Sequence, residues 1–153
     1  MITYMKTHNR KGKIIMIFAI IAAVLGAVVI IGLIADGPGR REIMELTFSD
    51  VDFNFNNLKN GTYVGEYKGT KSHLRDVMVE ITVSGGEVKD VRILKGAVDG
   101  NGKPVKMKGQ YIDEFLKNAI QSETLDVDVI SGATVTSKSH LKALEDALMK
   151  AQP

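Results

Sequence analysis

Residues 14–35 form an uninterrupted apolar segment, which limits the possible folds of this chain more than any other feature. The segment reads IIMIFAIIAAVLGAVVIIGLIA and contains no charged or strongly polar side chain. About 20 apolar residues in a helix are enough to cross the hydrocarbon core of a bilayer. A cleaved signal peptide has a shorter apolar stretch and a small residue before the cut, whereas this segment ends Leu33-Ile34-Ala35. We therefore predict an uncleaved transmembrane helix over residues 14–35.

The charged residues on the two sides of this helix predict its orientation. Residues 1–13 contain no acidic residue and four basic ones, namely Lys6, Arg10, Lys11 and Lys13. The residues that follow the helix have mixed charge, with Arg40 and Arg41 accompanied by Asp36, Glu42 and Glu45. Because basic flanks stay in the cytoplasm, we predict a single-pass protein of the cell membrane. Its N-terminus is then cytoplasmic and its C-terminal domain extracellular.

The chain divides into four predicted regions. A cytoplasmic basic tail (1–13) and the transmembrane helix (14–35) are followed by a juxtamembrane linker (36–60) and an extracytoplasmic domain (61–152). Within the linker, Gly37-Pro38-Gly39 predicts the end of the membrane helix, because Gly and Pro are the strongest helix breakers.

Composition excludes several kinds of function. Four of the 20 Lys and Arg lie in residues 1–13 and none of the 18 Asp and Glu does, so the remainder carries a formal net charge of about −2. Nucleic-acid binding needs a basic surface, so we expect none. The chain has no Cys, which excludes disulfides, thiolate metal sites and iron–sulfur clusters. A redox function would therefore require a bound cofactor.

Hydrophobic periodicity predicts a sheet in the first half of the domain. Residues 62–68 indicate a first strand, and residues 76–84 alternate apolar and polar side chains, as a half-buried strand does. Gly85-Gly86 predicts a tight turn into a partner strand over residues 87–95. Val88 is out of step with the other apolar residues of that strand, which predicts a β-bulge.

The second half predicts helices. Residues 96–106 read as a loop, residues 108–121 as an amphipathic helix, residues 126–130 as a short strand and residues 136–151 as a final helix. A small sheet made from a hairpin needs helices on one face to bury its apolar side. We therefore predict an α+β domain, a small antiparallel sheet with helices packed on one face, preceded by the transmembrane helix.

A cluster of hydroxyl groups precedes the last helix. Gly132 and Ala133 lie among four hydroxyl residues, which are Ser131, Thr134, Thr136 and Ser137. Ser and Thr at a helix start ordinarily cap free N–H groups, and one such residue is routine. Four exceed what a cap needs, and a helix N-terminus with small residues also binds phosphate readily. From the residues alone, capping and phosphate binding both remain open.

The same stretch resembles a known family. Asp128, two further residues, Ser131-Gly132-Ala133-Thr134 and then Thr136 follow the signature of the flavin-mononucleotide (FMN)-binding domain. Residues 61–67 resemble the opening strand of that domain and residues 79–94 its hairpin. The domain occurs in peripheral flavoprotein subunits of sodium-pumping quinone reductase and Rnf-type complexes, and in small membrane-anchored surface proteins.

The resemblance implies a covalent cofactor. In that family a flavin transferase outside the cytoplasm joins the flavin phosphate to the signature Thr as a phosphoester. Carried over, Thr134 is the acceptor of FMN and Thr136 the second choice. Asp128, Ser131, Gly132 and Ala133 would form the element that the transferase recognises. Lesser candidates for approaching the phosphate are His140 and Lys138.

We therefore predict a membrane-anchored extracytoplasmic flavoprotein that carries electrons and is not a stand-alone enzyme. Its partners would be the flavin transferase, a membrane electron donor and an extracytoplasmic acceptor, or the subunits of a redox complex. One alternative is a non-redox or sensory module that binds FMN reversibly, and another is an accessory subunit of a larger membrane redox complex. The loop at residues 95–100 lacks the His that related domains often carry there, so the surroundings of the flavin ring stay open.

Overall fold

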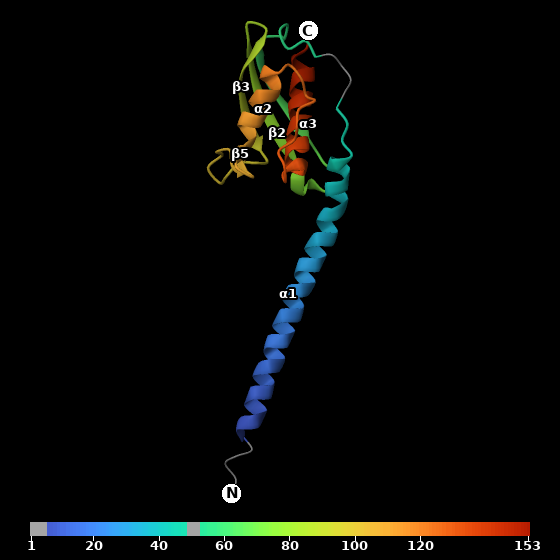
Figure 1. Cartoon of the computed structure of the whole chain (residues 1–153), viewed down its shortest axis with the longest axis vertical. Helices are drawn as coiled ribbons and strands as arrows, with labels where there is room; N and C mark the ends of the chain where they lie inside the picture. Colours follow the sequence, from blue (N-terminus) through green and yellow to red (C-terminus); the bar gives the residue numbers. More distant parts are fainter. Residues whose placement is uncertain (1–5, 49–52) are drawn as a thin grey trace. The chain divides into compact units, whose positions relative to one another are not determined.

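The computed structural model describes residues 6–48 and 53–153 of the chain. The chain forms two compact units, Met1–Gly37 and Pro38–Pro153. We call the second unit the C-terminal domain. Helix α1 (Lys6–Met44) begins in the first unit and ends in the second (Figure 1).

The described residues of the first unit belong to α1. Among the described residues, one helix is long and apolar enough to cross a membrane, with a mean hydropathy of 3.3 in its apolar window. Its large side chains, such as Ile14, Phe18 and Leu25, are exposed rather than packed against protein. An apolar helix over residues 14–35 is thus confirmed, whereas its insertion in a membrane and its orientation stay predictions.

The prediction that Gly37-Pro38-Gly39 ends this helix is wrong, because α1 continues through Pro38 to Met44. A proline inside a helix removes one backbone hydrogen bond, and its ring clashes with the Cβ of the residue before it. Here that residue is Gly37, which has no Cβ, so part of the penalty is absent.

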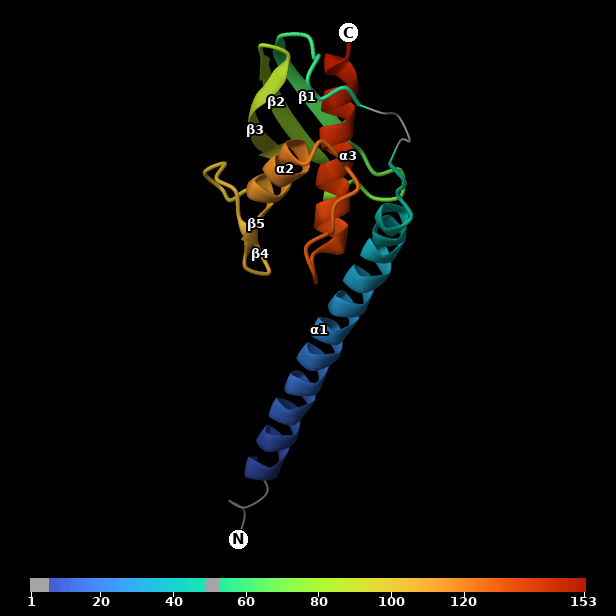
Figure 2. The ribbon, with the colours of Figure 1, turned by 45° about the horizontal axis from the view of Figure 1, so that its top comes forward.

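A three-stranded antiparallel sheet forms the centre of the C-terminal domain. Its order is β1 (Gly61–Tyr67), β2 (Val77–Ser84) and β3 (Glu87–Lys95). Helix α3 (Thr134–Ala151) packs on β1 and β2, and helix α2 (Ile112–Gln121) packs on β3 (Figure 2). The predicted α+β fold with helices on one face of the sheet is confirmed.

The hairpin between β2 and β3 follows its predicted geometry. Gly85 and Gly86 have φ angles of 66° and 84°, which a tight two-residue turn requires and which glycine adopts without strain. The register changes between Thr82, which pairs with Asp90, and Val83, which pairs with Val88. The intervening Lys89 therefore has no partner on β2, and the predicted bulge is confirmed.

The segment between β3 and α2 differs from the sequence prediction. The predicted loop of residues 96–106 leads into β4 (Lys106–Met107), which pairs with β5 (Gln110–Tyr111) as a small hairpin. Its turn, Lys108-Gly109, has φ angles of 54° and 93°, which a right-handed helix excludes, so α2 begins at Ile112 and not at residue 108.

The strand predicted over residues 126–130 is absent from the described structure. The backbone N–H of Ile130 donates instead to the side-chain oxygen of Ser137, at 3.2 Å. The segment packs against the core without joining the sheet, because Ile130 is buried and Val127 is partly buried against the core cluster. Helix α3 begins at Thr134, two residues earlier than predicted.

Residues that we assigned to the linker contribute to the core of the C-terminal domain. Ile43, Phe55 and Leu58 are buried in the same cluster as the sheet and the helices. Two lysines of α3 bind carbonyl groups at the end of α1. Lys138 Nζ donates to Met44 O at 2.7 Å and Leu46 O at 3.2 Å, and Lys142 Nζ donates to Thr47 O at 3.1 Å.

The contact of α3 with β1 depends on a glycine. A Cβ on Gly65 would lie 2.0 Å from the carbonyl oxygen of Ala143 and 2.3 Å from the backbone nitrogen of Ala147. We predict that Gly65→Ala lowers the free energy of unfolding by about 2–3 kcal/mol, because overpacking forces helix and strand apart. Thermal unfolding of the protein in detergent, followed by circular dichroism, measures the change.

Gly100→Ala is the matched control, because a Cβ there would meet no atom within 4 Å. We expect its unfolding temperature to equal that of the wild type. If the two alanine variants unfold at the same temperature, the close contact between β1 and α3 is not as the structure describes it.

Candidate functional site

The predicted signature residues lie where the chain turns into α3. Ser131 and Gly132 form the turn, and Gly132 has a φ of 74°, a conformation that favours glycine. The turn is closed by the backbone N–H of Ala133, which donates to Ile130 O at 2.9 Å. Ala133 occupies the N-cap position, and Thr134 is the first residue of the helix.

One hydroxyl of the predicted cluster holds this turn in place. The side-chain oxygen of Ser137 accepts from the N–H of Ile130 at 3.2 Å and donates to the carbonyl of Ala133 at 3.1 Å. Ser137 is fully buried, so its role is structural. The N-cap residue Ala133 makes no side-chain capping bond, which leaves the N–H groups of the first helical turn without a side-chain cap.

A groove of about 320 Å³ lies at this helix start. We call it the Thr134 groove. It is lined by Arg40, Met44, Arg75, Gly132, Ala133, Thr134, Val135 and Thr136. The lining therefore combines a helix N-terminus, two guanidinium groups and two hydroxyls, and among the described residues it contains no carboxylate. Such a surface favours a bound anion.

The structure divides the six predicted site residues into two groups. Gly132, Ala133, Thr134 and Thr136 line the Thr134 groove, and both threonines are half-buried. Asp128 and Ser131 are exposed and lie outside its lining. Asp128 and Ser131 thus face solvent beside the groove and do not contribute to its lining.

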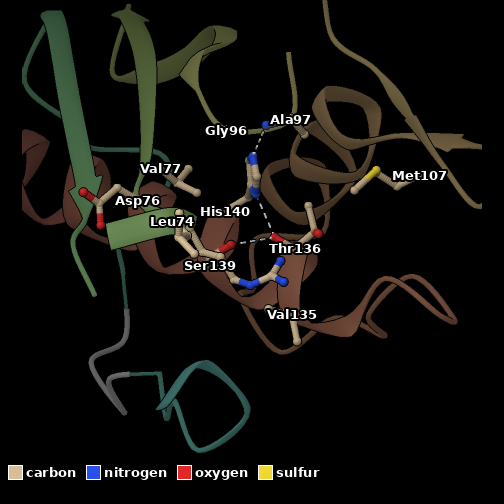
Figure 3. A pocket seen from close by; sticks show the side chains of 11 residues that line it. Leu74, Asp76, Val77, Gly96, Ala97, Met107, Val135, Thr136, Ser139 and His140 are labelled. Atoms are coloured by element: carbon tan, nitrogen blue, oxygen red, sulfur yellow. Dashed lines mark hydrogen bonds between the residues drawn. The ribbon is translucent and has the colours of Figure 1, made fainter. Parts of the chain in front are cut away.

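A second pocket, of about 180 Å³, adjoins the groove. We call it the His140 pocket (Figure 3). It is lined by Leu74, Arg75, Asp76, Val77, Gly96, Ala97, Met107, Val135, Thr136, Ser139 and His140. The two cavities share Arg75, Val135 and Thr136, so a single ligand could occupy both.

His140 connects α3 to the loop that follows β3, as the dashed lines in Figure 3 show. Its Nε2 accepts from the N–H of Ala97 at 3.1 Å, and its Nδ1 lies 2.7 Å from the carbonyl oxygen of Thr136. These partners require a neutral ring with the proton on Nδ1. Burial lowers the pKa of His140 to about 4, because the charged form would lose its hydration.

Gly96 allows this arrangement. Its φ is 122°, and a Cβ there would lie 2.7 Å from the Nε2 atom of His140. The ring is thus a wall of the His140 pocket and lies outside the lining of the Thr134 groove. Lys138, the other lesser candidate, binds the carbonyl groups after α1.

Sequence reasoning missed the two arginines of the groove. We used Arg40 only as a charge that predicts orientation, and Arg75 not at all. Arg40 is near the end of α1 and Arg75 is the last residue of the 3-10 helix η1 (His73–Arg75). No local pattern links these positions to residues 132–136, because only the folded chain brings them together.

Comparison with known protein families identifies a domain in this part of the chain. The family model of the FMN-binding domain matches residues 74–149. The match extends from Leu74 in η1 to Met149 in the last turn of α3 and includes Arg75 and the whole signature, whereas Arg40 and Met44 precede it. A search of curated proteins found no significant match.

The buried neutral histidine predicts an acid-labile domain. The folded pKa of His140 is about 4 and its ordinary value is 6.5. Unfolding therefore takes up a proton between these pH values, so the free energy of unfolding is highest above pH 6.5 and falls towards pH 4. The fall amounts to about 3 kcal/mol from this residue. Urea denaturation at a series of pH values measures it.

Two variants separate His140 from other groups that titrate in this range. His140→Gln should flatten the dependence between pH 6.5 and pH 4, because glutamine has no proton to gain. His73→Gln is the control, because His73 is exposed, and it should keep the steep dependence. Equal slopes in the wild type and His140→Gln would contradict the assignment.

Proposed function

Because residues 74–149 belong to the FMN-binding domain family, we propose that this protein is a membrane-anchored flavoprotein that carries electrons through an FMN joined to Thr134. The observation that carries the proposal is the position of Thr134. It is the first residue of α3, half-buried in a groove whose described lining includes two arginines. A phosphate attached to its hydroxyl would lie at the helix N-terminus, where anions bind best.

The residues of the Thr134 groove fit the phosphate end of FMN. The first turn of α3 offers N–H groups that no side chain caps. Gly132 and Ala133 are small, so a ligand can approach the backbone closely. A Cβ on Gly132 would come within 3.2 Å of the Lys108 side chain, which restricts this position to glycine further.

The adjoining His140 pocket fits the flavin ring. Its apolar lining includes Val77, Ala97 and Met107, and the imidazole of His140 is neutral. The bound FMN would supply the capacity to take up and release one or two electrons. The protein would position the ring, exclude water from it and keep a fixed hydrogen-bond pattern along the pocket wall.

The exposed signature residues fit recognition by another protein. Attachment would replace the Thr134 Oγ–H bond by an Oγ–P bond. The bond from the same phosphorus to the leaving group of an activated flavin-phosphate donor would break, the hydroxyl proton would pass to solvent, and a flavin transferase would catalyse the exchange. Asp128 and Ser131 are exposed beside the acceptor and are available to that transferase. Thr136 lines the same groove and is the second-choice acceptor.

The location that we propose follows from the basic tail before α1. With residues 1–13 in the cytoplasm, the C-terminal domain is extracytoplasmic, where the transferase acts. A covalent bond would there prevent loss of the cofactor by dilution. The electron donor would lie in the membrane and the acceptor outside it, or both would be subunits of one redox complex. The protein itself would be a carrier.

Substitution of the acceptor tests the proposal. We predict that protein produced together with a flavin transferase is yellow and is heavier by one FMN less one water. Thr134→Ala should abolish the mass increase, because no other hydroxyl occupies the helix start in the same way. Thr136→Ala is the matched control and should keep it. Intact-mass spectrometry and absorbance measure both.

The other outcomes distinguish the alternatives. A Thr134→Ala variant that keeps the adduct would contradict Thr134 as the acceptor. A wild type that binds FMN but gains no mass would favour the reversible or sensory module. A protein that acquires flavin only together with other membrane subunits would favour the accessory role.

A further inference from the structure

We propose that His140 is a positioning residue for the flavin ring. Its hydrogen bond to the N–H of Ala97 fixes the loop after β3 as one wall of the His140 pocket, and this wall sets the redox potential of bound FMN. This role rests on the proposed function and deepens it, because it assigns a task to a buried side chain that lies outside the signature.

The loop that forms this wall, residues 96–107, is closed by its own hydrogen bonds. The N–H of Val105 donates to the carbonyl of Ala97 at 3.0 Å, so the two ends of the loop meet at Ala97. Between them, the carboxylate of Asp99 accepts from two N–H groups of the loop, at 2.8 and 2.9 Å. Met107 follows in β4 and lines the pocket. A shift of the loop at Ala97 would therefore also move Met107.

The bond to His140 fixes the position of this loop. The side chains of Val98 and Val105 are partly buried against the core, but apolar contacts are not directional. The N–H of Ala97, by contrast, donates to Nε2 of His140 at 3.1 Å, and both residues are buried. A buried donor that loses its acceptor is costly, so the bond restricts the loop to one position.

His140 is itself held in one orientation. Its Nδ1 lies 2.7 Å from the carbonyl oxygen of Thr136, and Gly96 is so close that a Cβ there would be 2.7 Å from Nε2. Both ring nitrogens are thus committed to backbone groups, and the ring is neutral. His140 would therefore act on the flavin through the loop and not through a charge of its own.

Exclusion of water is the means by which the wall would affect the flavin. Ala97 and Met107 present apolar side chains to the pocket. Reduction places more negative charge on the flavin, and water stabilises this charge better than an apolar wall does. A fixed wall would therefore keep the potential of FMN lower than a displaced wall that admits water.

Two charged residues also line the pocket. Asp76 accepts from the N–H of Gly69 at 3.1 Å and from Lys95 Nζ at 3.4 Å, and its side chain turns away from His140 in Figure 3. Arg75 is the cation of the described lining. Both residues are retained in every variant below, so a difference in potential between variants reports the wall and not these charges.

Two substitutions of His140 and one control test the contact in the full-length protein. His140→Leu has a similar size but no acceptor, so it leaves the N–H of Ala97 without its bond. His140→Gln keeps a side-chain acceptor and should rescue the contact. Met149→Gln is the matched control, because Met149 is exposed on the same helix and does not line the pocket.

Hydrogen–deuterium exchange of the flavin-free protein in detergent measures the loop itself. We expect His140→Leu to speed exchange in residues 96–107 about tenfold, and the other two variants to keep wild-type rates. Faster exchange throughout the domain would mean that His140→Leu does not fold. Gly96→Ala then replaces it, because the new Cβ would disturb the same contact from the side of the loop.

The midpoint potential of FMN measures the consequence for the cofactor, in protein produced together with the transferase. We expect His140→Leu to raise the potential by about 30 mV, which for a two-electron couple is a tenfold shift towards the reduced form. The visible circular dichroism of the flavin should weaken in the same variant. His140→Gln and Met149→Gln should keep the wild-type potential and spectrum.

Unchanged exchange in residues 96–107, or an unchanged potential, in the variant that lacks the contact would overturn the role of His140. A potential in His140→Gln that shifts as far as in His140→Leu would do the same. A wild type that gains no flavin mass contradicts the covalent carrier instead, and the potentials are then measured on protein saturated with added FMN. A wild type that binds no FMN in that titration overturns the role of His140 as well.

Discussion

The site depends on hydrogen bonds between buried polar side chains of α3 and the two loops that surround its N-terminal end. Ser137 holds the turn before the helix through Ile130 and Ala133, and His140 holds the loop after β3 through Ala97. Both side chains are buried on the helix face that packs into the domain. Without these bonds the Thr134 groove and the His140 pocket would lose a wall each, so the same contacts that stabilise the fold also define the site.

Three charged side chains bind backbone groups in and around the end of α1. Glu42 accepts N–H groups of residues 70–71, and Lys138 and Lys142 donate to carbonyls of residues 44–47. These bonds make the segment at the end of α1 a part of the C-terminal domain. An anion in the groove would therefore contact both the end of α1 and the start of α3. Cofactor binding would thus depend on the packing of the segment at the end of α1.

Local patterns predicted much of the fold but only half of the site. Gly85-Gly86 and Val88 predicted the hairpin and its bulge, because turn geometry and side-chain alternation act over a few residues. The start of α2 was predicted too early, at residue 108, because the periodicity of the apolar residues does not reveal the positive φ angles of Lys108 and Gly109. The helix start that forms the Thr134 groove was placed to within two residues. Arg40 and Arg75 could not be predicted, because their proximity arises only when distant segments pack together.

The central claim is that one flavin phosphate is bonded to the hydroxyl of Thr134. Peptide mapping by mass spectrometry, on protein isolated from its native membrane, tests it most directly. The account predicts that the peptide covering residues 126–138 carries the mass of one FMN less one water, and that fragmentation places this mass on Thr134. An unmodified peptide in the native protein, or the same mass on another residue, would contradict the account.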